Sequence, residues 1–219
     1  MSSVLRKHAI LFIIIISISI LLIASGLLIL VQNMPVTSSI SDAKGDVYAL
    51  PLFSNKPTPM VGGYHDILNA SVKRTTDGGL LFSIELADNI GYYRDEYEVV
   101  YIWSIEYITA SLQKREYKLV IPYFPKGQGL SINGWYLAVF DASSNKWLVP
   151  MLKIDDDMRG NRVDIDLDAR VIGEPVLFWW SVDVMVNVDT SIHGQPDYLM
   201  DSAPDNGKAM LSPLSFRWG

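Results

Sequence analysis

The longest uninterrupted apolar run lies near the N-terminus. Residues 9–31 contain no charged side chain and are dominated by Ile and Leu. A helix of those 23 residues would be about 35 Å long, enough to cross the ~30 Å hydrocarbon core of a bilayer with some tilt. Arg6 and Lys7 precede the run, and no basic residue follows it before Lys44. The pattern therefore predicts a transmembrane anchor, with residues 1–8 in the cytoplasm and the rest of the chain outside the cell.

A cleaved signal peptide and a pilin leader are the alternatives to an anchor. A secretory signal peptide would be cleaved near the small residues Ala24, Ser25 and Gly26, but its apolar region is usually about 7–15 residues long. An archaeal pilin leader usually has a charged stretch, a small residue at the cleavage site and then an apolar helix with an early Glu. That Glu is missing here. An uncleaved anchor inserted in the lipid bilayer is the interpretation we adopt.

Beyond residue 31 the spacing of the hydrophobic positions changes. Residues 32–41, with Pro35 and a Thr-Ser-Ser run, predict a short polar tether. From residue 42 onward apolar and polar side chains alternate, as in β-strands with one buried face. Asp77-Gly78-Gly79 favours a hairpin turn between the first two alternating segments. The predicted strands are 66–74, 79–87, 97–107, 115–123, 135–141, 146–154, 162–167, 176–186 and 210–218.

These segments predict a mainly β fold over residues 42–219. Eight or nine short strands separated by Gly, Pro, Asn and Ser turns favour an antiparallel β-sandwich or barrel. Apolar residues make up 49% of the 219-residue chain, which is enough to fill the core of one domain. The chain has no Cys, which excludes disulfides, thiolate metal sites and cysteine catalysis.

The charge balance and the motifs exclude several classes of function. The chain has 18 basic residues, two of them ahead of the leader, so the remainder carries 16 basic against 24 acidic residues, a net charge of −8. A domain of that sign repels phosphate backbones, and we expect no nucleic-acid partner. The sequence contains no nucleophile elbow, no His-Glu-x-x-His motif and no phosphate loop, and no pair of its carboxylates is singled out for glycoside hydrolysis. We therefore expect a protein that is not an enzyme.

Several short signatures occur in a fixed order along the domain. They lie at residues 42–46, 65–67, 79–86, 178–181 and 201–207. In this order they resemble the DOMON-like superfamily, which includes the family 9 carbohydrate-binding modules, and especially uncharacterised membrane-anchored surface proteins of archaea. The resemblance covers most of residues 42–212. It implies a β-sandwich at the cell surface and makes carbohydrate the expected ligand class. Heme, another ligand of the superfamily, is bound there through Met and His, and only His65 and His193 follow the leader here.

Carboxylates gather near both ends of the domain. The residues are Asp42, Asp46, Asp66, Asp201 and Asp205, and their oxygens are ligands that Ca²⁺ prefers. Family 9 modules, which the domain resembles, pair their first and last strands and often contain structural calcium. The five residues are therefore candidate ligands for a calcium ion that joins the two ends of the domain. The alternative is that each aspartate caps the backbone of its own turn.

Aromatic side chains are the candidate carbohydrate ligands, because sugar rings pack on aromatic faces. Trp179 and Trp180 are adjacent in an apolar strand and must face opposite sides of a sheet. One is expected in the core, and the other beneath a loop or on a binding platform. Core packing is the alternative for every member of the larger aromatic set, which also includes Trp103, Trp135, Trp147, Tyr92 and Tyr93.

Asn69-Ala70-Ser71 is a glycosylation sequon, and its use requires the side chain of Asn69 to face solvent. Taken together, the sequence predicts a membrane-anchored extracellular module that binds carbohydrate or envelope proteins. A structural component of the cell envelope or of a surface filament, and an accessory subunit of a membrane complex, are the alternatives.

Overall fold

The computed structural model of the chain describes residues 16–26, 36–50, 63–90, 98–124, 133–154, 160–189, 197–205 and 207–212. In this part of the chain the protein is mainly β, and its sheets are antiparallel. The elements are β1 (Thr37–Ser41), β2 (Tyr48–Leu50), η1 (Gly63–His65), β3 (Ile67–Arg74), β4 (Gly79–Leu86), β5 (Glu98–Ile108), β6 (Lys114–Phe124), β7 (Gly134–Asp141), β8 (Lys146–Lys153), β9 (Arg162–Asp168), η3 (Ala169–Ile172), β10 (Phe178–Asp189), β11 (Asp197–Ala203) and β12 (Ala209–Leu211).

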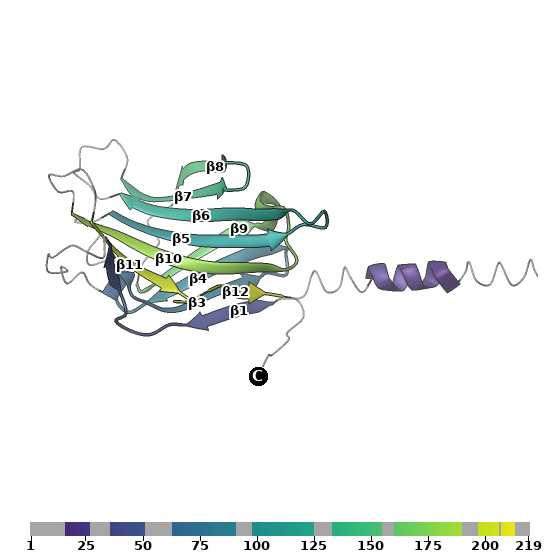
Figure 1. Ribbon diagram of the computed structural model, residues 1–219, viewed down its shortest axis with the longest axis horizontal. Coiled ribbons are helices and arrows are strands. Elements are labelled where there is room, and N and C mark those ends of the chain that lie inside the picture. The colour runs from purple at the N-terminus through teal and green to yellow at the C-terminus, as the bar shows by residue number, and fades with distance from the viewer. Residues whose placement is uncertain are drawn as a thin grey trace, which may run out of the picture.

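The strands form two sheets, which lie one behind the other in Figure 1. The first has the order β1-β3-β4-β9, and the second has the order β2-β11-β10-β5-β6-β7-β8. β11 and β12 both pair with β10, one after the other along its length, through Val182↔Ala203 and Phe178↔Leu211. The last part of the domain therefore returns to the middle of the second sheet.

Alternation along the strands fills one core with side chains from both sheets. Phe82 of β4 meets Trp103 of β5 edge to face, with ring centroids 5.9 Å apart, and both side chains are fully buried. β9 shows the alternation most clearly, as predicted from its sequence. Val163, Ile165 and Leu167 are buried, while Asp164, Asp166 and Asp168 are exposed.

Each segment predicted to be a strand contains one, although residues 213–218 of the last segment lie outside the described residues. β1, β2 and β11 were not predicted. Residues 37–41 were predicted to belong to the polar tether, but they form β1 and pair with β3 from Thr37↔Lys73 to Ser41↔Asn69. The sequence of β1 has one apolar residue, Ile40, which packs against the core. Main-chain pairing holds the rest of this edge strand, so its hydrophobic pattern is too weak to predict it.

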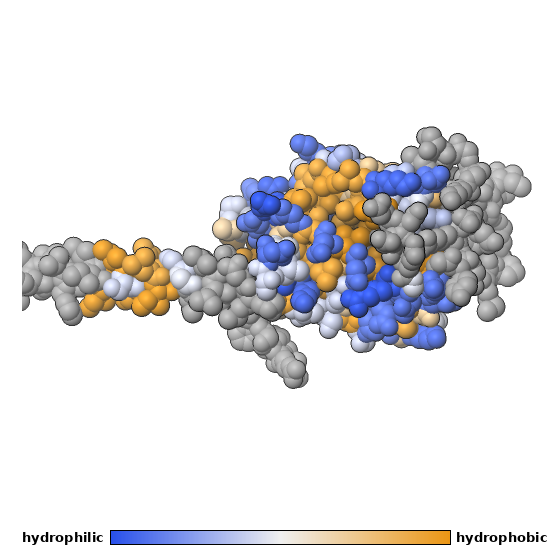
Figure 2. All heavy atoms as spheres, turned by 180° about the vertical axis from the view of Figure 1, so that it is seen from behind, coloured by the Kyte–Doolittle hydropathy of each residue, from blue (hydrophilic) through white to orange (hydrophobic). Residues whose placement is uncertain are grey.

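Within the predicted anchor, residues 16–26 are helical. In Figure 2 most of the visible face of this helix is apolar. No helix in the described ranges is long and apolar enough to cross a membrane. The other parts of the predicted anchor, 9–15 and 27–31, are not among the described residues, and the anchor stays a prediction.

Candidate metal centre

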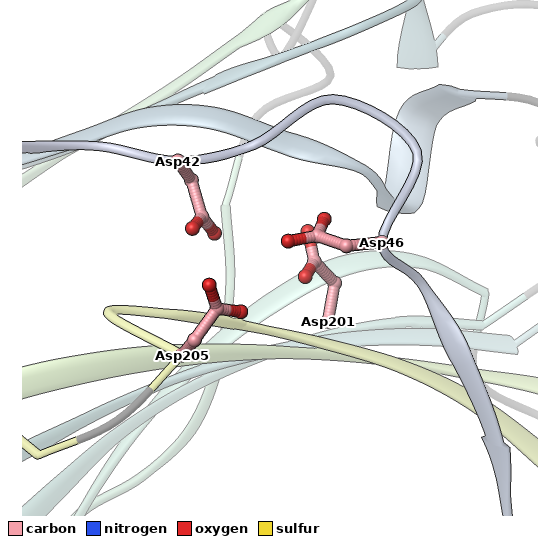
Figure 3. Close-up of side chains that lie close together, drawn as sticks. All are labelled: Asp42, Asp46, Asp201 and Asp205. Atoms are coloured by element: carbon pink, nitrogen blue, oxygen red, sulfur yellow. The ribbon is translucent and has the colours of Figure 1, made fainter.

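Four of the five predicted metal ligands come together at one place in the fold. Asp42 directly follows β1, and Asp46 ends the turn that leads to β2. Asp201 lies in β11, and Asp205 comes just after that strand. Each offers a carboxylate oxygen, and these oxygens all lie within 4.8 Å of one another. Figure 3 shows the four carboxylates pointing toward a common centre from two segments that are far apart in the sequence.

Asp66, the fifth predicted ligand, is not one of these four and holds the turn that contains Asp42 and Asp46. The main-chain N–H of Gly45 donates hydrogen bonds to its Oδ1 and Oδ2, at 3.0 and 3.1 Å. Gly45 has a φ of 86°, a conformation that disfavours a side chain. The N–H of Asp42 also donates to the carbonyl of Leu68, at 2.9 Å. Asp66 thus positions two of the other carboxylates.

Asp201 is the most deeply placed member of the cluster. Its side chain is 1% exposed. The N–H of Ile67 donates to its Oδ2 at 2.5 Å, and the N–H of Ser202 donates to its Oδ1 at 2.8 Å. The first bond joins β11, in the second sheet, to the start of β3, in the first. The protein's own main chain therefore fixes this carboxylate in position.

Burial and mutual repulsion make this cluster unfavourable in its fully ionised form. Burial raises the pKa of Asp201 to about 7. Two backbone hydrogen bonds lower this pKa, and the negative charges of Asp42 and Asp46 raise it further. Burial is also the largest cause that raises the pKa of Asp42 to about 6, and the negative charges of Asp205 and Asp46 are the next largest. In the described part of the chain no Lys or Arg forms an ion pair with any of the four. At neutral pH no ion pair with a described Lys or Arg therefore offsets the charge of these four carboxylates.

Two oxygens of the cluster also lack a hydrogen-bond donor. Oδ2 of Asp42 and Oδ1 of Asp46 are inaccessible to solvent and have no hydrogen-bond partner among the described residues. Leaving a buried acceptor unsatisfied costs about 1–3 kcal/mol, and more when it is charged. Ca²⁺ binds oxygens at about 2.4 Å, so ligands on opposite sides of the ion are about 4.8 Å apart. Mg²⁺, at about 2.1 Å, requires a tighter set. The upper limit of 4.8 Å on the oxygen separations does not distinguish the two ions, and Ca²⁺ would need further oxygens to complete its six to eight ligands.

The raised pKa values predict how the ion-free protein responds to pH. Asp42 and Asp201 bind protons more tightly in the folded state (pKa about 6 and 7) than in the unfolded chain, where an aspartate has a pKa of about 3.9. Between these values the unfolded chain releases its protons first, so stability falls as pH rises. In chelator, the melting temperature should drop by roughly 5 °C from pH 5 to pH 8. A melting temperature that rises over this interval would contradict the assignment.

The structure separates the two adjacent tryptophans, as predicted. Trp180 is fully buried, and its Nε1 donates to Oγ of Ser38 in β1 at 3.1 Å. Trp179 faces the opposite side of the sheet, half-buried, and lines a shallow cavity of about 380 Å³ with Tyr107 and Pro175. Trp180 has no exposed surface that could contact a sugar. Of this pair, only Trp179 therefore stays a candidate ligand-binding residue.

Trp147 is more exposed than either, and the sequence pattern did not single it out. Its side chain is 53% exposed, and its ring packs on that of Phe140 with centroids 4.9 Å apart. Phe140 lies on the outer face of the second sheet, because its neighbours Val139 and Asp141 are buried. The sequence of β8 contains a signal for this exposure. Its apolar residues are consecutive between two lysines and do not alternate with polar ones, as in an edge strand exposed on both faces.

The remaining candidates have varied positions. Asn69 is exposed, with Nδ2 donating to Oε2 of Glu85 at 3.1 Å, so its side chain faces solvent as glycosylation requires. His65 is buried against Tyr64, with ring centroids 5.4 Å apart. Trp103 and Trp135 belong to the core. His193, Tyr92 and Tyr93 lie outside the described residues.

Comparison with known proteins adds no relative. No protein-family model, no curated protein and no solved structure matches the chain. The resemblance to the DOMON-like superfamily therefore rests on the sequence signatures and stays a prediction.

Proposed function

We propose that this protein is a membrane-anchored surface module, a DOMON-like β-sandwich held outside the cell by residues 9–31 and closed by a calcium ion. The convergence of four aspartates from the first and last parts of the domain is the observation behind the calcium part of this proposal. These segments are separated by more than 150 residues of sequence, and their like charges would otherwise drive them apart.

Calcium would join two segments whose carboxylates carry like charges. On one side lies the turn with Asp42 and Asp46, and on the other lie Asp201 and Asp205. An ion that binds only the folded chain stabilises it by mass action, by about 2.7 kcal/mol at a concentration one hundred times the Kd. A module outside the cell meets calcium continuously, so the ion would be a structural part of the domain and not a signal.

The proposed ligand is carbohydrate, bound on the outer face of the second sheet. Trp147 and Phe140 form an exposed aromatic surface there. Lys118, whose strand β6 pairs it with Phe140, supplies a polar group beside the rings. An aromatic face for sugar C–H groups, with neighbouring donors for hydroxyls, suits a glycan of the cell envelope. This proposal replaces Trp179 by a more accessible residue as the expected carbohydrate ligand.

A glycan-binding assay on the purified full chain in detergent tests this proposal. Trp147→Ala should reduce binding of a recognised glycan at least tenfold, because the stacking surface is lost. Trp179→Ala should leave binding unchanged and is the matched control, since that residue lies on a different strand. Binding that survives Trp147→Ala, or a chain that recognises no glycan, would contradict the carbohydrate assignment.

An envelope structural component is the second candidate, and the exposure of β8 favours it. This edge strand presents Trp147, Leu148, Met151 and Leu152 to solvent. Pro150 and the flanking lysines oppose the addition of another strand, so contacts would form through side chains. Concentration-dependent sedimentation without glycan binding would favour this candidate over the first.

A further inference from the structure

The end of the domain at which β1 begins is built from segments that are distant in sequence. Thr37, the first residue of β1, pairs with Lys73, and the next residue, Arg74, donates a hydrogen bond to the carbonyl of Pro175. Pro175 lines the same cavity as Ile108, the last residue of β5. Figure 1 shows the start of β1, the end of β12 and the turn between β5 and β6 at one end of the domain.

This end has large apolar side chains in solvent. Leu112 is 85% exposed, Ile108 48%, Leu177 41% and Met210 40%. Ile108 and Leu177 line the cavity that also contains Trp179, and Met210 pairs with Trp179 across β12 and β10. The exposed residues therefore form one surface, which we call the proximal surface, with Leu112 at its outermost turn.

Leu112 is unfavourable where it stands if the domain meets only water. It lies in the β5–β6 turn with a φ of 61°, a left-handed conformation that favours Gly or Asn over a residue with a bulky side chain. The turn is closed by main-chain hydrogen bonds, from Thr109 to Gln113 and from Leu112 to Thr109. No burial compensates for the conformation. An apolar environment outside the domain would account for leucine at this position.

The proposed anchor places such an environment close by. If the anchor ends at residue 31, residues 32–36 separate it from β1. Five residues span at most about 17 Å when fully extended. The proximal surface is the end of the domain from which this short segment departs, so it is held within reach of the headgroups of the bilayer.

The charged groups of the proximal surface are largely paired with one another. Lys114 and Lys208 both contact Glu106, at 3.0 and 2.5 Å, and Arg170 contacts Asp168 at 2.5 Å. Glu174 and Lys73 are also exposed at this end, and their opposite charges balance. Without an excess of basic groups, attraction to anionic lipid is weak, and burial of apolar side chains is the available driving force.

From these observations we propose that the proximal surface rests on the outer leaflet of the bilayer, with Leu112 inserted below the headgroups and Ile108, Leu177 and Trp179 at the interface. The inference rests on the proposed anchor. It gives the domain a fixed orientation, because a tryptophan and aliphatic side chains at the interface resist rotation about the short tether. The outer face containing Trp147 would then stand to the side of the contact.

A fluorescence experiment on the full chain tests this orientation. The chain has no Cys, so Leu112→Cys introduces a single site for an environment-sensitive dye. The labelled chain is reconstituted in phosphatidylcholine vesicles, with and without phosphatidylglycerol, and quenched by lipids with a doxyl group on the acyl chain. Asp88→Cys is the matched control, exposed and at the opposite end of β4 from the proximal surface. The dye at 112 should be quenched several-fold more than the dye at 88, in both vesicles.

Each contrary result would overturn the inference in a distinguishable way. A chain extracted by alkaline carbonate has no anchor, and the proposed function fails together with the inference. A chain that resists extraction while both dyes stay equally unquenched removes the inference alone. Quenching that needs phosphatidylglycerol would show attraction by charge instead of apolar insertion. Leu112→Asn should leave the melting temperature in detergent unchanged or raise it, and a fall would show that Leu112 serves the fold.

Discussion

Trp180→Ala is expected to lower the free energy of unfolding by about 3–5 kcal/mol, whereas Trp179→Ala should lower it by about 1 kcal/mol or less. The two residues are adjacent, but only Trp180 is fully enclosed. Its removal leaves a cavity between the sheets and abolishes the hydrogen bond from its Nε1 to Ser38. That bond holds β1 against the core, so we also expect β1 to loosen first.

Chemical denaturation of the full chain in detergent measures the difference between the two variants. Hydrogen exchange of the β1 amides provides the second readout, with faster exchange expected for Trp180→Ala and no change for Trp179→Ala. Equal losses of stability would contradict the assignment of the two rings to opposite faces. The prediction also shows why Trp180 variants are unsuitable for testing ligand binding, since any loss of binding would follow from unfolding.

Asp46→Asn and Asp205→Asn are expected to have opposite effects with and without calcium. In millimolar calcium at pH 8 each should melt roughly 5–10 °C below the unmodified chain, because one charged ligand is lost. In chelator each should melt at the same temperature or higher, because the substitution relieves repulsion among four carboxylates. Asp46 is the sharper test, since an amide nitrogen could replace its unpartnered Oδ1.

Asp166→Asn is the control for these variants. Asp166 is exposed on β9 and is outside the cluster, so its substitution should shift melting by little in either condition. If Asp46→Asn and Asp205→Asn lower the melting temperature equally in calcium and in chelator, the aspartates act as turn caps and the metal centre is wrong.

The sequence predicted the parts of the fold that depend on hydrophobic alternation. β9 is an example, since its buried Val163, Ile165 and Leu167 follow the pattern residue by residue. β1 and β11 were not predicted because neighbouring strands and the acidic cluster determine their positions. β11 places Asp201 in the interior, where a pattern of apolar residues gives no signal.

The sequence predicted which aspartates belong to the candidate site, but not which of them could bind an ion and which one holds the main chain. Aspartates at the two ends of the domain indicated a shared ion, and four of the five meet. The fifth, Asp66, holds the main chain of Gly45 with both oxygens, and only tertiary structure distinguishes such a residue from a ligand. Trp147 was not singled out for a related reason, because the exposure of an edge strand depends on which neighbours it lacks.

Calcium titration of the full chain by calorimetry, in detergent at pH 7.5, tests the central claim most directly. We predict saturable binding of one ion per chain, with an affinity that falls as pH is lowered from 7 to 5 and Asp201 and Asp42 become protonated. The absence of saturable binding up to millimolar calcium, together with identical melting in calcium and in chelator, would contradict it.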